Sequence, residues 1–201
     1  MQYCDKLLNS QEPETSKILF FDVETQGLLS NYHGICQIAC ILDIDGTTVW
    51  EWESIVRPPH LNRTSDQAVK IHGINNERMY YEGIDYEELH FELTSNLGTY
   101  IDKYDRNDKA TPSAFNGNFD YGFISEVFSR NSDDYMGSLL NHRIIDPLAY
   151  YRFYAVKYGW ALENMKLKTI ANALDIEITA HDALSDTRAL REITYTILKG
   201  I

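Results

Sequence analysis

Cysteine is scarce in this sequence, which contains only Cys4, Cys36 and Cys40. Three thiols at these spacings give no disulfide framework, and an odd count of this kind suits a reducing compartment. Cys36 and Cys40 lie four residues apart on an expected strand, without Cys or His partners at zinc-ligand spacing. They are therefore expected to be core thiols in an intracellular protein.

Positive charge is also in short supply. The chain has 18 Lys and Arg against 30 Asp and Glu, which gives a formal net charge of -12 and a pI near 4.8. This balance argues against a protein that holds duplex or membrane by long-range attraction. If nucleic acid is the partner, its contacts must be local and assisted by metal ions. Most of the acids are expected on a solvated surface.

No apolar stretch approaches the length of a membrane span, and the N-terminus has no basic-then-apolar signal pattern. The sequence also lacks internal repeats, low-complexity segments and an interdomain linker. We expect a soluble cytoplasmic protein without membrane contact, in which residues 1–16 are a loosely ordered lead-in and residues 17–201 form one domain. A hydrophobic content of 44% is enough to fill the core of such a domain.

The order of apolar runs, turns and helix caps predicts an α/β fold. Strands are expected at 17–24, 34–42, 47–56, 113–116 and 143–146. Helices are expected at 65–72, 86–104, 119–130, 148–157, 167–174 and 183–199, with Asp85 capping the second and Gly73 closing the first. The predicted class is a mixed five-stranded sheet flanked by helices, with three antiparallel strands first and a parallel second half.

Acids occupy positions where apolar side chains are expected. Asp22 and Glu24 interrupt a buried strand and point to one face, because strand side chains alternate. Asp120 lies one turn before the apolar stripe of its helix, and Asp186 one turn before Leu190. Taken singly, Asp120 and Asp186 could be ordinary first-turn acids, since helix N-termini favour negative charge.

Four inward acids repel one another unless cations hold them. Their oxygen ligands favour Mg²⁺ or Mn²⁺, whereas zinc prefers His or Cys. His181 precedes Asp186 by five residues in the expected loop before the last helix, where an imidazole is a competent general base, although a lone His is more often surface or core. Two hard metal ions roughly 3.5 to 4 Å apart assist in-line phosphoryl displacement, which indicates phosphodiester hydrolysis.

Three motifs resemble those of the DnaQ-like, or DEDDh, 3′-to-5′ exonucleases. They are Phe-Asp-Val-Glu-Thr-Gln-Gly-Leu at 21–28, Asn-Gly-Asn-Phe-Asp-Tyr-Gly-Phe at 116–123 and His-Asp-Ala-Leu-Ser-Asp at 181–186. Segments 71–74, 145–149 and 167–171 resemble the same family. The motifs follow the family's order and separation, so the resemblance covers about 17–199.

The resemblance implies a ribonuclease H-like fold and two divalent metal ions, Mg²⁺ or Mn²⁺, in each active site. It makes Asp22 a ligand of both ions, Glu24 and Asp186 ligands of the ion on the nucleophile side, and Asp120 a holder of the second ion, often through water. It makes His181 the base that deprotonates the attacking water.

The substrate site follows from the same resemblance. The family places the backbone around Thr25 against the terminal 3′ hydroxyl, and Leu28 and Ile74 against bases, although either side chain can equally be core. The matching segments also make His72 and Asn116 candidate substrate-binding residues. Phe115 departs from the His of many relatives, and a packing change without loss of chemistry is expected there.

The predicted function is a 3′-to-5′ exonuclease that releases 5′-mononucleotides from single-stranded DNA. The aromatic segments 150–154 and 158–160, with nearby cations, could contact bases, although core packing is the commoner role of such rings. Short RNA or RNA 3′ tails are the nearest alternative substrate. A more distant alternative is a metal-dependent nucleic-acid-binding module without turnover, which would not need His181.

The sequence ends shortly after the third motif, so no appended polymerase or helicase domain is expected. Processive action would then need a homodimer or an accessory replication or repair protein.

Overall fold

The computed structural model describes residues 16–159, 163–179 and 182–199. The predicted lead-in, residues 1–16, therefore lies outside the described residues except for Ser16. Four strands form one sheet in the order β3-β2-β1-β4. Their bounds are Lys17–Thr25 for β1, Ile35–Ile44 for β2, Thr47–Ile55 for β3 and Thr111–Ser113 for β4. The first three strands are antiparallel and β4 runs parallel to β1, which confirms the predicted mixed class.

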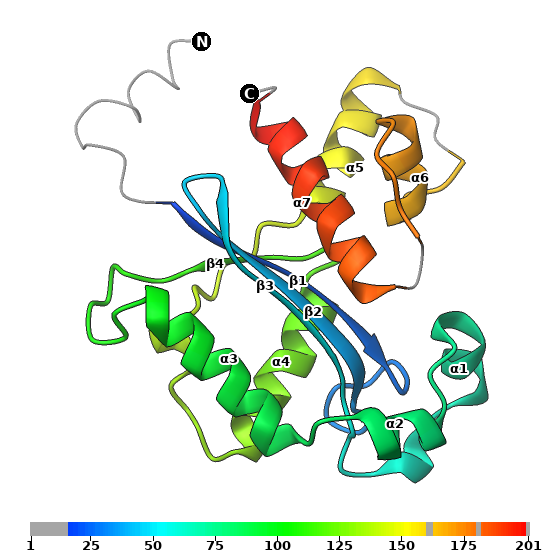
Figure 1. The fold of residues 1–201 in the computed structure, drawn as a ribbon. Coiled ribbons are helices and arrows are strands. Elements are labelled where there is room, and N and C mark those ends of the chain that lie inside the picture. The colour runs from blue at the N-terminus through cyan, green and yellow to red at the C-terminus, as the bar shows by residue number, and fades with distance from the viewer. Residues whose placement is uncertain (1–15, 160–162, 180–181, 200–201) are drawn as a thin grey trace.

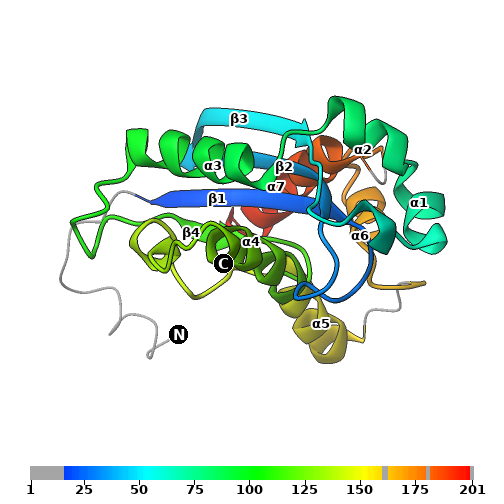
Figure 2. The same ribbon diagram turned by 90° about the horizontal axis from the view of Figure 1, so that it is seen from below.

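Helices cover both faces of this sheet (Figure 1). The helix bounds are Asp66–His72 for α1, Asn76–Glu82 for α2, Tyr86–Tyr100 for α3, Asn118–Arg130 for α4, Pro147–Tyr158 for α5, Leu167–Ala173 for α6 and Ala183–Lys199 for α7. Figure 2 faces the sheet, with α3 and α4 in front of it and α7 behind it. Short 3-10 turns follow β3 at Leu61–Arg63 and α4 at Met136–Ser138.

Strand β1 is apolar on both faces because it is covered on both faces. Leu19, Phe21 and Val23 belong to the core formed with α3 and α4, whereas Ile18 and Phe20 pack with Leu190 of α7. Side chains alternate along a strand, so positions 22 and 24 continue the face that begins with Ile18 and Phe20. The two acids of β1 therefore face α7.

Helix caps fall where the sequence predicts them. The Ser65 hydroxyl accepts the N–H of Ala68 at the start of α1, and Gly73 ends this helix with a left-handed φ of 76°. Asp85 accepts the N–H of Glu88 at the start of α3. These side chains satisfy N–H groups that a helix leaves without internal partners.

Helix α3 ends at Tyr100, four residues earlier than predicted. Asp102 accepts the N–H of Tyr104, and Asp108 accepts the N–H of Asp102, so local side-chain bonds hold the following segment in turns. The chain also forms α2, which the sequence did not predict. Its cap is Asn75, whose side chain accepts the N–H of Arg78.

The predicted fifth strand, residues 143–146, is reduced to a single parallel bridge between Ser113 and Ile145. Ile145 donates its N–H to the carbonyl of Pro112, and its own carbonyl accepts the N–H of Ala114. Pro112 has no N–H with which to continue the ladder towards residue 143. The described sheet consequently has four strands where five were predicted, with the same mixed direction.

Both described cysteines are core thiols, as predicted. Cys36 and Cys40 are fully buried and free, and burial raises the pKa of the Cys36 thiol to about 12. Cys4 lies outside the described residues. Within the described ranges, no helix combines the length and the apolar character needed to cross a membrane.

Candidate active site

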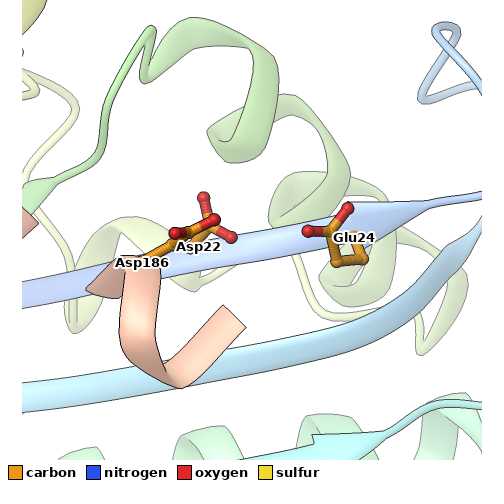
Figure 3. Close-up of side chains that lie close together, drawn as sticks. All are labelled: Asp22, Glu24 and Asp186. Atoms are coloured by element: carbon orange, nitrogen blue, oxygen red, sulfur yellow. The ribbon is translucent and has the colours of Figure 1, made fainter. Parts of the chain in front are cut away.

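Three carboxylates from the two ends of the chain meet between β1 and α7. Asp22 and Glu24 project from β1 and Asp186 from the first turns of α7, as Figure 3 shows. One carboxylate oxygen from each of the three lies within 4.8 Å of the other two. This spacing allows one cation to contact all three acids.

The start of α7 fixes the place of Asp186. The Asp182 side chain accepts the N–H of Ser185 at 2.8 Å, and the Asp182 carbonyl accepts the N–H of Asp186 at 2.8 Å. One turn later Leu190 is buried against Ile18 of β1. A cap at one end and an apolar anchor at the other therefore hold Asp186 over the strand.

Asp120 reaches the same strand from its edge. Strand β4 ends at Ser113, which pairs with Phe20, so β4 does not cover the part of β1 that follows. There Asp120, in the first turn of α4, accepts the N–H of Val23 at 3.3 Å and is buried. Asp120 is not one of the three acids with mutually close oxygens, but its charge is the strongest single-residue influence raising the pKa of Asp22.

Burial and neighbouring carboxylates raise the pKa values of Asp22, Glu24 and Asp120. Burial is the largest cause of the raised pKa of Asp22, followed by the charges of Asp120, Asp186 and Glu24. The pKa of Glu24 rises to about 7 through burial and then the charges of Asp186 and Asp182. The pKa of Asp120 also rises to about 7, first through burial and then through Glu24 and Asp146, although the N–H of Val23 opposes this rise.

This donor set suits hard divalent cations. All four side chains offer carboxylate oxygens, and among the described residues no Lys, Arg or His forms an ion pair with Asp22, Glu24 or Asp120. Bringing these charges together without a cation is unfavourable, as the raised pKa values show. Oxygen-only sites of this type bind Mg²⁺ and Mn²⁺ in preference to zinc.

His181, the predicted general base, lies outside the described residues. The description stops at Thr179 and resumes at Asp182, the residue that caps α7. The role of His181 therefore stays a prediction.

His72 connects α1 to the end of β1. Its Nδ1 accepts the N–H of Ile74 at 3.1 Å, so the ring proton belongs on Nε2, which lies 3.3 Å from the carbonyl oxygen of Thr25. The Thr25 hydroxyl donates to the carbonyl of Gly27 at 2.8 Å. His72 and Thr25 thus lie together beside Glu24, where the resemblance placed the terminal nucleotide.

Leu28 and Ile74 have opposite environments. The side chain of Leu28 is 80% exposed in the loop that follows β1, whereas Ile74 is 1% exposed and packs with Cys36 and Met79. Of the two roles that the sequence allowed for each, Leu28 fits contact with a base. Ile74 has the core role, because the surrounding side chains keep a base away from it.

Gln26 is a buried residue of this region that the sequence analysis missed. Its side-chain oxygen accepts the N–H of Gly34 at 2.8 Å, and its amide nitrogen donates to the His60 carbonyl at 2.9 Å and to Thr64 Oγ1 at 2.8 Å. These bonds close the loop that exposes Leu28 and tie it to the segment before α1. The only sequence signal is a polar residue directly after the strand acids, which does not reveal distant partners.

Asn116 lies at the entrance to α4 in a left-handed conformation, with a φ of 62°. Its side chain is exposed, and its backbone N–H donates to Asp146 Oδ1 at 3.1 Å. The same Asp146 oxygen accepts the N–H of Leu148 at 3.0 Å and so caps α5. Asp146, a second missed residue, connects the Asp120 loop to α5.

Phe115, the residue before Asn116, packs among apolar side chains. It is partly buried and packs against two apolar clusters, one containing Tyr151 and Ile193 and the other containing Phe20 and Leu190. The aromatic ring thus contributes to packing beside α7, where many relatives are expected to carry His.

Comparison with known proteins supports the same family. Residues 19–86 match the exonuclease family model RNase_T, and curated relatives match over most of the chain. The resemblance to the DnaQ-like exonucleases is confirmed. This DnaQ-like chain is 27% identical over 182 residues to the PolC-type DNA polymerase III of Bacillus cereus and 28% identical over 182 residues to that of Oceanobacillus iheyensis.

The aligned part is a small share of those relatives. In both cases it covers 90% of this DnaQ-like chain and 11% of the polymerase. The chain thus spans about a tenth of the length of the curated relatives it matches.

Solved structures show the fold. The zinc-bound complex of E. coli exonuclease I with single-stranded DNA matches 93% of this DnaQ-like chain and 41% of its own, with a TM-score of 0.77 and 22% identity. Its complex with a dT13 oligonucleotide matches 90% and 41%, with a TM-score of 0.76 and 23% identity. The ribonuclease H-like α/β fold is therefore confirmed.

The matched family model and the curated relatives thus support an exonuclease domain of the DnaQ type, a class of hydrolase. This family depends on divalent metal ions, and the acids of β1 and α7 form a matching cluster.

Proposed function

We propose that this domain removes nucleotides one at a time from the 3′ end of single-stranded DNA and releases 5′-mononucleotides. The observation that carries the proposal is the group formed by Asp22, Glu24 and Asp186, whose oxygens lie within 4.8 Å of one another in an exonuclease fold. DNA is favoured over RNA because the similar exonuclease I structures contain single-stranded DNA and the similar PolC-type proteins are DNA polymerases.

The acids would hold two Mg²⁺ or Mn²⁺ ions. Asp22 would contribute to both ions, Glu24 and Asp186 to the one on the side of the attacking water, and Asp120 to the other. When bound, the ions supply positive charge for the attacking and leaving oxygens of the phosphodiester. His181 would accept the proton of the attacking water and so act as the general base.

The terminal nucleotide would lie at the end of β1. The backbone at Thr25 would contact the 3′ hydroxyl, and His72 keeps that backbone in place through its 3.3 Å contact with the Thr25 carbonyl. Leu28, held outward in a loop closed by Gln26, would pack against the terminal base. Asn116 would contribute from the entrance to α4. An unpaired end fits such a site, because a paired end would have to open first.

The decisive assay uses 5′-labelled single-stranded DNA and RNA of the same sequence with Mg²⁺. Wild-type protein should shorten DNA from its 3′ end, Asp22→Ala should leave it intact, and Asp134→Ala should behave as wild type. Asp134 is a matched control because it is exposed and lies in the loop after α4. A folded wild-type protein that shortens neither polymer would refute the proposal.

The same assay separates the alternatives. Shortening of RNA alone would assign the site to RNA 3′ ends. Metal-dependent binding of the oligonucleotide without any shortening would identify a binding module that retained its acids.

A further inference from the structure

Helix α5 exposes aromatic rings where a surface helix usually carries charged residues. Phe153 is 63% exposed and Tyr158 55% exposed, whereas Tyr151 is buried against α6 and α7. The helix lies at the periphery of the molecule, with α7 on its inner side (Figure 2). One face of α5 therefore packs into the core, and a face that carries aromatic residues lies at the surface.

Three rings form a ladder along the helix, of which Tyr158 is exposed and Tyr150 and Tyr154 are half-buried. The ring centroids of Tyr150 and Tyr154 are 4.4 Å apart at an interplanar angle of 30°, and those of Tyr154 and Tyr158 are 5.1 Å apart at 41°. The ammonium of Lys157 lies 4.9 Å from the ring centroid of Tyr158 and 5.9 Å from that of Tyr154. We call Tyr150, Tyr154, Tyr158 and Lys157 the tyrosine ladder.

The charge of α5 is opposite to that of the whole chain. Its sequence, Pro-Leu-Ala-Tyr-Tyr-Arg-Phe-Tyr-Ala-Val-Lys-Tyr, has two cations and no acid, in a chain of net charge -12. A face that combines rings with an adjacent cation and excludes acids is complementary to the bases and phosphates of a single strand.

The ladder begins beside the carboxylates. Asp146, Tyr150, Tyr154 and Tyr158 are spaced four residues apart, so they follow one side of the helix. Asp146 bonds the backbone of Asn116, and its charge contributes to the raised pKa of the nearby Asp120. The ladder therefore leads away from the edge of the proposed active site.

We propose that the tyrosine ladder holds the single strand upstream of its 3′-terminal nucleotide, with the rings stacking on bases and Lys157 contacting a phosphate. The proposal rests on the function proposed above. From Tyr150 to Tyr158 the helix rises about 12 Å, which matches three to four stacked nucleotides at about 3.4 Å each. Only substrates of several nucleotides would reach it.

Substrate length provides the test. The double variant Tyr154→Leu/Tyr158→Leu removes two rings and keeps apolar bulk. Its kcat/KM should fall about 5- to 100-fold on a 12-nucleotide single strand, as expected when stacking on one or two bases is lost. Its kcat/KM on the p-nitrophenyl ester of thymidine monophosphate should equal that of wild type, since this ester reaches only the carboxylates.

Two matched controls sharpen the result. Tyr154→Phe/Tyr158→Phe keeps the rings and should retain wild-type activity on the 12-mer. Lys157→Gln and Arg152→Gln each remove one charge from α5, but residues 152 and 157 lie about 140° apart around the helix. Only Lys157→Gln should weaken cleavage of the 12-mer.

Several outcomes would contradict the proposal that the tyrosine ladder holds the single strand. Unchanged 12-mer cleavage by the Leu variant would do so, and so would equal losses on both substrates, because the effect would then be structural. A change in self-association by sedimentation, without a change in 12-mer affinity, would assign the face to protein contact. If wild-type protein cleaves nothing, the proposed function fails, and the affinities of wild type and variants for a labelled 12-mer with Ca²⁺ still decide the ladder.

Discussion

At the scale of single residues, the site consists of acids whose positions are unfavourable without a cation. Asp22 is partly buried, and Glu24, Asp120 and Asp186 are buried. The pKa values of Asp22, Glu24 and Asp120 are raised mainly by burial and then by the charges of neighbouring carboxylates. Such an arrangement lowers the stability of the metal-free protein and favours the metal-bound form.

Asp120→Asn should stabilise the metal-free protein at high pH. The folded pKa of Asp120 is about 7, above its ordinary value of 3.8, so between these values the folded state binds a proton that the unfolded state does not. Stability from this group is therefore lost as pH rises through that window. In EDTA at pH 8, urea unfolding should show the variant more stable by about 2 kcal/mol.

The gain should shrink towards zero below about pH 3, where the carboxyl of Asp120 is largely protonated in the folded and in the unfolded state. The amide oxygen introduced by the substitution can still accept the N–H of Val23, so the comparison isolates the charge. Equal stabilities of the two proteins at pH 8 would show that repulsion at this site is negligible.

His181→Ala should separate proton transfer from metal binding. If His181 is the general base, turnover of single-stranded DNA should fall by about 10² to 10⁴, while Mn²⁺ affinity stays at the wild-type value. His142→Ala is a suitable control, because that imidazole is exposed. An unchanged rate in single-turnover kinetics would remove His181 from the mechanism.

At the scale of elements, features that depend on local sequence periodicity could be predicted, and hydrogen-bond partners that are distant in the sequence could not. Alternation along β1 predicted the shared face of Asp22 and Glu24, and the stripe of α7 predicted the inward position of Asp186. The buried bonds of Gln26 depend on Gly34, His60 and Thr64, which periodicity does not connect. The convergence of these three acids was thus expected from the sequence, whereas the bonds that support the neighbouring loop needed the fold.

The same reason explains the errors in secondary structure. The predicted fifth strand is shortened because Pro112, which lacks an N–H, lies on the edge of β4 that faces residues 143–146. Which edge of β4 faces that segment depends on the fold and cannot be read from periodicity. The short helix α2 has too few residues for a clear apolar period. Helix α3 ends early because Asp102 and Asp108 accept backbone N–H groups and hold the following residues in turns. Helix propensity alone predicts that the helix continues there.

Gly117→Ala should disturb α4 and, through it, Asp120. A Cβ at Gly117 would lie 2.7 Å from Ile144 Cγ2 and 3.0 Å from the Ala114 carbonyl oxygen, so neighbouring atoms would have to move. Its φ of -58° is allowed for any residue, so crowding is the cause. Thermal or urea unfolding should show a loss of about 1 to 3 kcal/mol, with weaker Mn²⁺ binding.

Two further variants test this explanation. Ile144→Ala in the Gly117→Ala background should recover part of the Mn²⁺ affinity by removing the crowded methyl group. Gly98→Ala, inside α3 with no atom within 4 Å of the new Cβ, should not destabilise the protein. Equal losses from Gly98→Ala and Gly117→Ala would contradict the crowding argument.

At the scale of the whole molecule, acidity limits how nucleic acid is held. We propose that residues 17–201 form a single exonuclease domain with few phosphate contacts, since the net charge is -12.

Cleavage should therefore depend only weakly on salt. With about two phosphate contacts, kcat/KM on a single strand should fall less than about tenfold between 50 and 200 mM NaCl. The measurement is a series of initial rates at constant Mg²⁺. A loss of about a thousandfold over this range would indicate an extensive basic surface, which contradicts the charge argument.

The central claim is that distant carboxylates form one cation site. Electron paramagnetic resonance can count bound Mn²⁺ in wild type, in Asp22→Asn/Asp186→Asn and in Asp134→Asn as a control. Wild type and the control should bind Mn²⁺ with the same stoichiometry, and the double variant should lose that binding while remaining folded. Unaltered Mn²⁺ binding by the folded double variant would contradict the account.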